Sequence, residues 1–428
     1  MKSLSLFNIS KTLGESTWVY NTLTSAFIKI STSVWNGLQD AKDESLLDML
    51  YQQGFVVDDN EVELAKYRYI YYSKMFDRRT LSVTIAPTMR CNFGCSYCFE
   101  GTHKVMPTMA KDVEDALVGY LREQAKTKEI AINWFGGEPL LAFDVIYSVC
   151  SRLDADGVKF VSSMVTNGSL LTGNVIGRLA LLHLTHLQIT LDGVAATHDR
   201  RRCYKNGKPS FADIMANIRQ LMQLTDIRLT IQVGVDNTNP TAYEDLYEYM
   251  QAEFPREMQA GRIVIGCNNI QNRTGFDRSG VCMTDRQLFE KGVRAVADGR
   301  YPVLMTSMPG RKLPCMYRCT NQTVIDPEGN MYRCLEHLGR KELSVGSIVS
   351  GKVSFGKIAG MAFMGDPFDD DECRNCAVLP VCGGGCPNDI AACKDRKHKS
   401  YCSMYKDYLS EMLPVLYERM QQGKENIN

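Results

Sequence analysis

Cysteine is distributed very unevenly along this chain, and this distribution restricts the possible folds more than any other feature. Of the 16 cysteines, three lie between Cys91 and Cys98 and nine lie between Cys315 and Cys402. Thiols this close along the chain are poor candidates for disulfides but good ligands for metal clusters. The remaining four are expected to be ordinary buried thiols: Cys150, Cys203, Cys267 and Cys282. The fold must therefore arrange two cysteine-rich segments around metal centres.

The overall composition excludes several functional classes. The chain has 428 residues and 44% hydrophobic content, enough for packed cores, and its length predicts about three domains. Its 49 basic and 49 acidic residues balance, so we expect neither nucleic acid nor an anionic membrane as a partner. No apolar run approaches the roughly 20 residues of a membrane span, and the polar start lacks a signal-peptide core. We therefore expect a cytoplasmic protein, in which reduced thiols are available for metals.

The first cysteine group is the segment Cys91-Asn-Phe-Gly-Cys95-Ser-Tyr-Cys98, which follows a strand-like run ending near Ala86. Three thiolates can hold three corners of an iron–sulfur cube, whereas four cysteines normally close one. One iron then has no protein ligand and is free to bind another molecule. From these residues alone, a zinc site or a buried group of cysteines is the alternative.

This CxxxCxxC spacing, with the aromatic Tyr97 before the last cysteine, resembles the radical S-adenosylmethionine (radical SAM) enzymes. The resemblance implies that Cys91, Cys95 and Cys98 bind a 4Fe-4S cluster, that the methionine part of SAM chelates the open iron, and that Tyr97 belongs to the cofactor site. Cleavage of SAM then gives a 5'-deoxyadenosyl radical, which abstracts hydrogen from an unactivated carbon. Such chemistry belongs to the cofactors, while the protein positions the reactants.

From Leu81 onward, apolar strands alternate with amphipathic helices. Six strands are expected near Leu81, Ile130, Lys159, His186, Arg228 and Arg262, each followed by a helix. This pattern predicts an α/β fold with a parallel sheet closed partway into a barrel, a partial (β/α)6 TIM-like barrel over residues 79–300. Active sites of such barrels lie at the carboxyl ends of the strands, so the informative residues are sought there.

The ends of the second and fourth strands carry candidate cofactor contacts. The second strand is followed by Gly136-Gly137-Glu138, whose glycines allow close approach of a ligand and whose carboxylate can accept from an ammonium group. By the resemblance, this motif binds the amino end of SAM, Thr190 contacts the ribose and Arg202 faces the carboxylate. The alternatives are an ordinary strand-to-helix connection for the glycines and a solvated loop for Arg200, Arg201 and Arg202.

The second cysteine group, within residues 301–402, resembles the SPASM extension of radical SAM enzymes, which carries two auxiliary 4Fe-4S clusters. By that resemblance the first cluster takes Cys319, Cys334 and Cys386, with Cys315 as the expected fourth ligand. The second cluster takes Cys373, Cys376, Cys382 and Cys402, and Cys393 is left over. A hairpin is expected from Gln322 to Arg333. Two zinc ions are the alternative occupants.

The two ends of the chain carry weaker signals. Residues 1–78 combine strand candidates at 4–9 and 16–30 with later helices. This order resembles the winged-helix-like module to which a precursor peptide's leader adds an edge strand in many peptide maturases; a merely structural extension is the alternative. Residues 403–428 have helical apolar spacing and predict a helix packed on the barrel.

Within this resemblance, two enzyme classes compete. Sulfatase-type maturases oxidise a Cys or Ser to formylglycine and carry a general-base aspartate after the cysteine that matches Cys334, where this chain has Leu335. We therefore expect a maturase of ribosomally synthesised peptides that installs a thioether, carbon–carbon or carbon–oxygen cross-link, with a flavodoxin- or ferredoxin-type electron donor. A formylglycine maturase, a peptide epimerase and a non-enzymatic iron–sulfur carrier are the alternatives.

Overall fold

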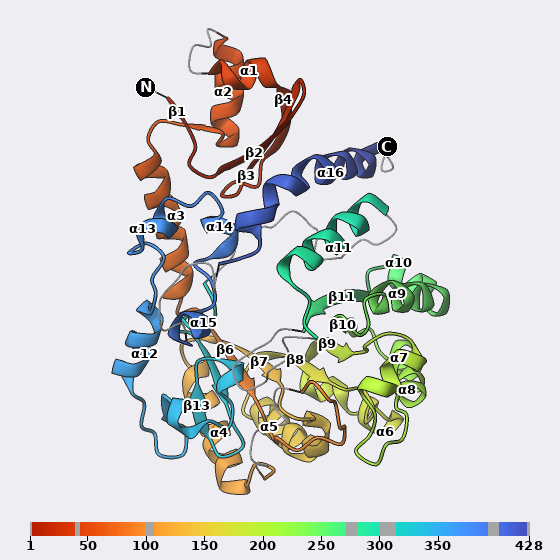
Figure 1. Ribbon diagram of the computed structural model, residues 1–428. Coiled ribbons are helices and arrows are strands. Elements are labelled where there is room, and N and C mark those ends of the chain that lie inside the picture. The colour runs from red at the N-terminus through yellow and green to blue at the C-terminus, as the bar shows by residue number, and fades with distance from the viewer. Residues whose placement is uncertain are drawn as a thin grey trace. The chain divides into compact units, whose positions relative to one another are not determined.

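The computed structural model describes residues 2–38, 43–98, 107–270, 281–298, 314–392 and 402–425. Cys393 therefore lies outside the described residues. The chain divides into two compact units, which are labelled by their helices and strands in Figure 1. Unit 1 comprises residues 1–76, 284–319 and 359–428, and unit 2 comprises residues 77–283 and 320–358.

Unit 2 contains the predicted barrel, and the α/β fold class is confirmed. Within the described residues, nine strands form one sheet in the order β11-β10-β9-β8-β7-β6-β12-β13-β14, and the neighbours from β11 to β12 are parallel. The strands β6 to β11 span Thr80–Ile85, Glu129–Trp134, Phe160–Thr166, Leu184–Thr190, Arg228–Val235 and Ile263–Asn269. Side chains such as Val83, Ile132 and Ile231 are completely buried or nearly so, which explains the apolar composition of these strands.

Helices connect successive barrel strands. They are α4 (Lys111–Ala125), η3 (Pro139–Ala142), α5 (Phe143–Ala155), α6 (Gly173–Ile176), η4 (Leu179–Leu182), α7 (Ala195–Arg201), α8 (Phe211–Leu224), α9 (Ala242–Glu253) and α10 (Pro255–Gln259). In α8, the buried residues Ile214, Ile218 and Leu221 recur every three or four positions. This spacing places them on one apolar stripe that faces the core.

The predicted hairpin extends the barrel sheet. Strand β12 (Gln322–Ile325) pairs in parallel with β6, and β13 (Asn330–Tyr332) and β14 (Gly346–Ser347) follow in antiparallel order. The turn is held by the buried carboxylate of Asp326, which accepts from the backbone N–H groups of Glu328 and Asn330 at 2.9 Å. Gly329 adopts φ +81°, a conformation that favours glycine. The short helices η5 (Leu335–His337) and η6 (Lys341–Leu343) lie between β13 and β14.

Unit 1 combines both ends of the chain. Its amino-terminal elements are β1 (Ser3–Leu4), β2 (Asn8–Leu13), β3 (Ser16–Asn21), β4 (Phe27–Ser31), α1 (Thr32–Asn36), α2 (Glu44–Gln53), β5 (Val56–Val57) and α3 (Asn60–Met75). The expected first strand is shifted, because the backbone turns at Ser5–Phe7, where Asn8 N–H donates to Ser5 O, and β2 begins only at Asn8. Strands β2, β3 and β4 form an antiparallel sheet in that order.

The later elements of unit 1 are α11 (Asp285–Asp298), α12 (Phe355–Phe363, which begins in unit 2), α13 (Asp371–Arg374), α14 (Leu379–Cys382), α15 (Pro387–Ala392) and α16 (Tyr405–Glu425). They share cores with the amino-terminal elements. Tyr67 and Tyr71 of α3 pack with Phe368 and Leu379, and Trp18 of β3 packs in a cluster with α16 residues. Unit 1 is therefore stabilised by contacts between segments about 300 residues apart in sequence.

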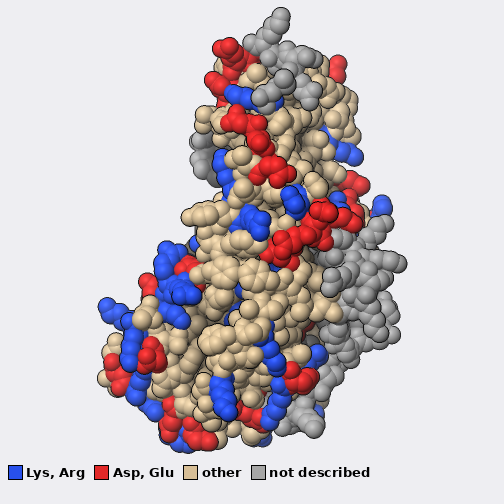
Figure 2. Space-filling view, turned by 90° about the vertical axis from the view of Figure 1, so that its left-hand side faces the viewer, with Lys and Arg blue, Asp and Glu red and all other residues tan. Residues whose placement is uncertain are grey.

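The molecular surface agrees with the neutral net charge. Acidic and basic side chains are interspersed over the face that is visible in Figure 2. No helix within the described ranges is both long and apolar enough to span a membrane.

Candidate active site at the carboxyl edge of the sheet

The loop with Cys91, Cys95 and Cys98 follows β6 at the carboxyl edge of the sheet. It is held by a neighbouring segment of unit 2: Gly94 N–H donates to Cys203 O, and Lys205 N–H donates to Asn92 O, both at 3.0 Å. The rings of Phe93 and Tyr204 meet edge-to-face with centroids 5.1 Å apart. The loop is thus anchored at several points, which restricts the positions of its thiols.

The three thiols of this loop form no disulfide, and all three residues are partly exposed. Burial raises the pKa of Cys91 to about 12, and the neighbouring Glu138, Cys95 and Cys98 add to this effect. Burial also raises the pKa of Cys95, although the positive charge of Arg202 acts to lower it. No set of three or more His, Cys, Asp or Glu side chains in the described parts of the chain is arranged around one metal ion. A cluster differs from such a site, because each thiolate binds a different iron.

Gly136 and Gly137 lie against the backbone that leads to the cysteine loop. A Cβ atom on Gly136, which has φ +116°, would lie 2.4 Å from Thr88 O, and one on Gly137 would lie 2.5 Å from both Met89 O and Arg90 O. Gly137 N–H donates to Thr88 O and Glu138 N–H donates to Arg90 O. The close approach that requires glycine is therefore to the protein's own backbone, and a cofactor contact from this segment stays a prediction.

Glu138 is completely buried, and the chain itself supplies its donors. Its Oε1 accepts from Leu140 N–H at 3.0 Å and Thr166 Oγ1 at 2.8 Å, and its Oε2 accepts from Asn167 N–H at 2.7 Å. Burial raises the pKa of Glu138, although these hydrogen bonds act in the opposite direction. This carboxylate therefore ties the end of β7 to the end of β8.

An amide network that the sequence did not reveal connects the cysteine loop to β8. Asn92 Nδ2 donates to Ser169 Oγ at 2.9 Å, and Asn167 Nδ2 donates to Asn92 Oδ1 at 2.8 Å. Asn167 stands at a strand end, the one sequence signal that could have identified it.

The expected residue Arg202 reaches the cysteine loop. Its Nη1 donates to the Tyr97 hydroxyl at 2.7 Å, and its guanidinium lies 6.0 Å from the centroid of the Phe93 ring. Its buried Nε has no hydrogen-bond partner among the described residues. Burial alone lowers the pKa of Arg202, but Tyr97, Cys95 and Asp192 outweigh it and raise the pKa above its usual value. The structure thus brings Arg202 and Tyr97 together, with one donor left unused.

Arg201 has a different environment, which sequence reasoning missed. Its Nε donates to Asp192 Oδ2 at 3.0 Å and its Nη2 donates to Asp236 Oδ2 at 2.9 Å. Both carboxylates are at most 1% exposed; Asp192 is the second residue after β9, and Asp236 is the first after β10. The other oxygen of Asp192, Oδ1, is buried and has no hydrogen-bond partner within the described parts of the chain. A buried donor on Arg202 and a buried acceptor on Asp192 thus lie unused near Tyr97 and Cys95.

Thr190, the last residue of β9, is partly buried and is aligned with Gln232 of β10, which in turn is aligned with Gly266 of β11. A Cβ atom on Gly266 would approach Gln232 Oε1 to 2.9 Å, and Gln232 Nε2 is a further buried donor without a partner in the described structure. The amide of Gln232 between the apolar residues Ile231 and Val233 is the sequence signal that could have identified it. The hydroxyl of Thr190 stays a predicted ribose contact.

Unit 1 brings four predicted ligands to one cavity. Cys373, Cys376, Cys382 and Cys402 line it together with Val378, Leu379 and Lys406. Of the other group, Cys319 is buried, Cys386 is partly buried and Cys315 is exposed, all in unit 1. Cys334 follows β13 in unit 2. The donor set around the cavity, four thiols and largely apolar walls, fits a thiolate-ligated cluster.

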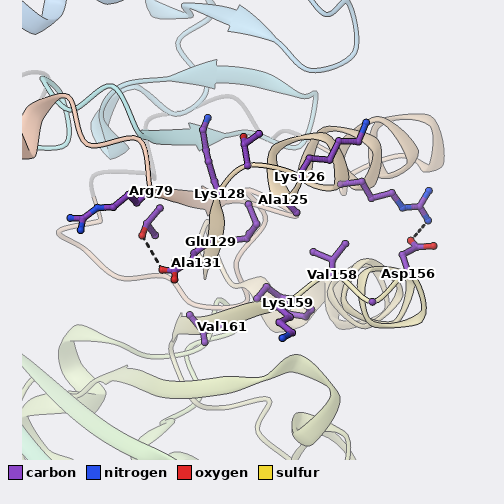
Figure 3. A pocket seen from close by; sticks show the side chains of 16 residues that line it. Arg79, Ala125, Lys126, Lys128, Glu129, Ala131, Asp156, Val158, Lys159 and Val161 are labelled. Atoms are coloured by element: carbon purple, nitrogen blue, oxygen red, sulfur yellow. Dashed lines mark hydrogen bonds and ion pairs between the residues drawn. The ribbon is translucent and has the colours of Figure 1, made fainter.

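A separate cleft of about 1270 Å³ lies at the opposite edge of the barrel sheet, where β6, β7 and β8 begin (Figure 3). Most of its basic side chains have partners: Arg79 pairs with Asp77, Arg122 with Asp156 and Lys126 with Glu123. Because this cleft is at the far end of the strands from the cysteine loop, we assign it no part in the chemistry.

Comparison with known proteins identifies the barrel. Residues 85–250 match the family model described as the radical SAM superfamily. The chain is 26% identical to a serine-type anaerobic sulfatase-maturating enzyme of Klebsiella aerogenes, over 76% of this chain and 84% of the relative. It is 23% identical to a PqqA peptide cyclase of Rhodopseudomonas palustris, over 72% and 81%.

Two solved structures share the fold. Native anSMEcpe with bound AdoMet has a TM-score of 0.62 and 18% identity, covering 81% of this chain and 100% of its own. Streptococcus suis SuiB bound to the precursor peptide SuiA has a TM-score of 0.56 and 13% identity, covering 94% and 98%. The part of this chain that anSMEcpe leaves uncovered is about as long as the amino-terminal module, residues 1–78.

Proposed function

This chain contains a radical SAM domain, and from that premise we propose that it is a peptide maturase that installs a cross-link in a ribosomally synthesised precursor. When bound, SAM and the cluster supply a 5'-deoxyadenosyl radical that abstracts hydrogen from the peptide. The residues of this chain hold the cofactors, position the peptide and exclude water from the radical.

The observation that carries the proposed cofactor site is the pair of unused buried atoms, Arg202 Nε and Asp192 Oδ1. An unpaired buried donor and acceptor are costly unless a ligand satisfies them. A zwitterionic ligand such as the methionine part of SAM offers both a carboxylate and an ammonium group. Cys91, Cys95 and Cys98 would hold the cluster beside them, with Tyr97 fixing Arg202 and Thr190 near the ribose.

The grouping of the cysteines after residue 314 supports two auxiliary clusters in the proposal. Cys373, Cys376, Cys382 and Cys402 line a common cavity and would hold one cluster. For the other cluster, the ligand set stays the one predicted from the sequence resemblance: Cys315, Cys319, Cys334 and Cys386. Such clusters can accept the electron that remains when a new bond closes on the substrate radical.

A peptide substrate is favoured by the relatives and by the amino-terminal module. Both sequence relatives are named for acting on sulfatases or on a peptide, and SuiB was solved with its precursor peptide. Leu335 stands where sulfatase-type maturases carry an aspartate, and an alkyl side chain cannot act as a base. Leu335 and the amino-terminal module therefore favour cross-linking over formylglycine formation as the proposed activity.

The leader of the precursor would pair with the outer edge of β4, which no described strand covers. Asn21 N–H donates to Ala26 O and Thr32 N–H donates to Glu15 O, so the alternation of an antiparallel ladder directs the N–H of Lys29 away from β3. By the same alternation, the N–H of Ser10 in β2 points outward at the opposite edge. Ile28 and Ile30, which share one face of β4, are only partly buried, so a leader at this edge can cover the rest of their apolar surface.

A matched pair of proline variants tests leader docking. Lys29→Pro removes an outward N–H from β4 without removing a bond to β3, and Ser10→Pro does the same on β2. We expect the first to weaken precursor binding about tenfold or more, as loss of one or two ladder hydrogen bonds predicts, and the second to leave binding unchanged. Equal effects of both variants would contradict docking on β4.

The reaction itself is tested by co-expression with a candidate precursor peptide, followed by mass spectrometry. A cross-link removes two hydrogens from the peptide and gives linked fragments. Serine oxidation to formylglycine removes the same mass, but its aldehyde reacts with a hydrazide, whereas a cross-link does not. An unchanged mass with deuterium uptake from heavy water would instead indicate epimerisation.

A further inference from the structure

Arg318 in unit 1 is a buried cation whose hydrogen bonds to described residues all go to neutral groups. It is only 1% exposed. Its Nη1 donates to the Tyr71 hydroxyl at 2.8 Å and to Gly383 O at 3.4 Å. Its Nη2 donates to Gly365 O at 2.7 Å and Met364 O at 3.2 Å. Its Nε is buried and finds no partner in the part of the chain that the structure describes.

This arrangement lacks a counter-charge. Arg318 makes no ion pair with any described residue, and the carboxylate of Asp366 is engaged by the Tyr72 hydroxyl at 2.5 Å. Burial of a charge without an anionic partner is strongly unfavourable, even when hydrogen bonds satisfy most of its donors. Neutral carbonyls and one hydroxyl therefore do not explain why a guanidinium is kept here.

The surroundings of Arg318 are the segments that carry proposed cluster ligands. Its backbone N–H donates to Cys315 O at 2.9 Å, and the next residue is the buried Cys319. On the other side, Gly383, Gly384 and Gly385 connect Cys382 to Cys386 with φ values of +68°, +84° and +76°. A Cβ atom on Gly384 would lie 3.3 Å from Nη1 and 2.7 Å from Pro367 Cβ. The glycine run is thus shaped closely around the guanidinium.

We propose that Arg318 is the charge partner of the auxiliary cluster bound through Cys319 and Cys386, and that it raises the reduction potential of this cluster. This inference rests on the proposed function, which supplies the cluster. A cluster held by thiolates is anionic and gains one negative charge on reduction, so a nearby buried cation stabilises the reduced form more than the oxidised form. Arg318 thereby makes the cluster a better acceptor for the electron from the substrate radical.

Lys406 provides a matched comparison in the same unit. It lines the cavity of the other four cysteines, but its side chain is 38% exposed and pairs with Glu372 at 3.6 Å. Solvent and the carboxylate both screen its charge. Removal of this cation should therefore change a cluster potential much less than removal of Arg318.

The test measures cluster potentials by a redox titration followed by electron paramagnetic resonance, on protein reconstituted with iron and sulfide. Arg318→Gln, or Arg318→Met if the amide prevents folding, should shift the one-electron equilibrium of one auxiliary cluster at least tenfold toward the oxidised form, which is 59 mV. Arg318→Lys should restore most of this shift. Tyr71→Phe, which removes a hydrogen bond but no charge, and Lys406→Gln should each change the potential less.

The result that would overturn the inference is an Arg318→Gln or Arg318→Met protein with full iron content and an unchanged potential. An equal shift in Tyr71→Phe would also overturn it, because packing rather than charge would then set the potential. Failure of the proposed function is distinct: absence of the auxiliary cluster on which the inference rests would appear in the iron content and spectrum of the wild-type protein, and absence of the cross-link would appear in the mass of the precursor.

Discussion

The two cysteine sites of this chain are built in opposite ways. In unit 2, three thiols come from one short loop, and the groups nearby are charged or polar, including Arg202 and Asp192 with unused hydrogen-bonding atoms. In unit 1, three thiols lie within residues 373–382 and the fourth is Cys402, and the walls of their cavity include Val378 and Leu379. A site with unused polar atoms is suited to bind a ligand, whereas a largely apolar site with four thiols is suited to enclose a cofactor.

The largest expected effect tests the loop of unit 2. Replacing Cys91, Cys95 and Cys98 together with alanine should abolish SAM cleavage, because no other thiol loop can hold the cluster that cleaves it. Iron content should fall from roughly twelve to roughly eight atoms per chain, since each cluster carries four. Undiminished SAM cleavage in this variant would refute the assignment of the loop.

The corresponding change in unit 1 should have a different outcome. Cys373→Ala combined with Cys376→Ala should remove about four irons and stop product formation, while SAM cleavage continues without coupling to product. Cys376 also packs against the cores formed with α3 and β3, so the melting temperature should fall. Cleavage assays, iron content and thermal unfolding measure the three effects. Loss of SAM cleavage in a folded variant would remove the functional distinction between the sites.

Two adjacent arginines separate structural charge from ligand-binding charge. Arg201→Gln leaves the buried carboxylates of Asp192 and Asp236 unpaired and should destabilise the protein by about 3–5 kcal/mol. Arg202→Gln removes the proposed partner of the SAM carboxylate and should weaken SAM binding about 10- to 100-fold with a smaller loss of stability. Denaturant unfolding and SAM titration check the pair. The opposite pattern would exchange the roles of the two residues.

The smallest expected effect concerns the buried carboxylate of Glu138. In Glu138→Gln, an NH2 group replaces one carboxylate oxygen and faces N–H donors, which should lower the free energy of unfolding by about 1–3 kcal/mol. Because burial raises the pKa of Glu138 in the folded state, its stabilising contribution is complete below the ordinary pKa of 4.5 and decreases as pH rises through the raised value. The difference between wild type and variant should therefore be larger at acid than at neutral pH.

Unfolding experiments at several pH values check this prediction. The wild type should lose up to about 1.4 kcal/mol per pH unit from this group in the titrating range, and the variant should lack this dependence. A difference that grows toward neutral pH would contradict the sign.

The sequence predicted the barrel well because each strand and helix is encoded locally. The strands near Leu81, Ile130 and Arg228 occur as predicted, since period and apolar content suffice to identify them. The pairing of Arg201 with Asp192 and Asp236 could not be predicted, because it depends on which strand ends become neighbours in the sheet. The close packing of Gly136 and Gly137 on backbone atoms of residues 88–90 could not be predicted for the same reason.

The pairing of β12 with β6 has a practical consequence for shortened versions of this protein. Strand β6 lies between β7 and β12 in the ladder, so a chain that ends before residue 320 would expose the unpaired N–H and C=O groups of β6. Such an open edge, rich in Leu81, Val83 and Ile85, is a template for association with other chains. We expect a truncated barrel to aggregate during expression, whereas a chain that continues through β14 keeps this edge covered.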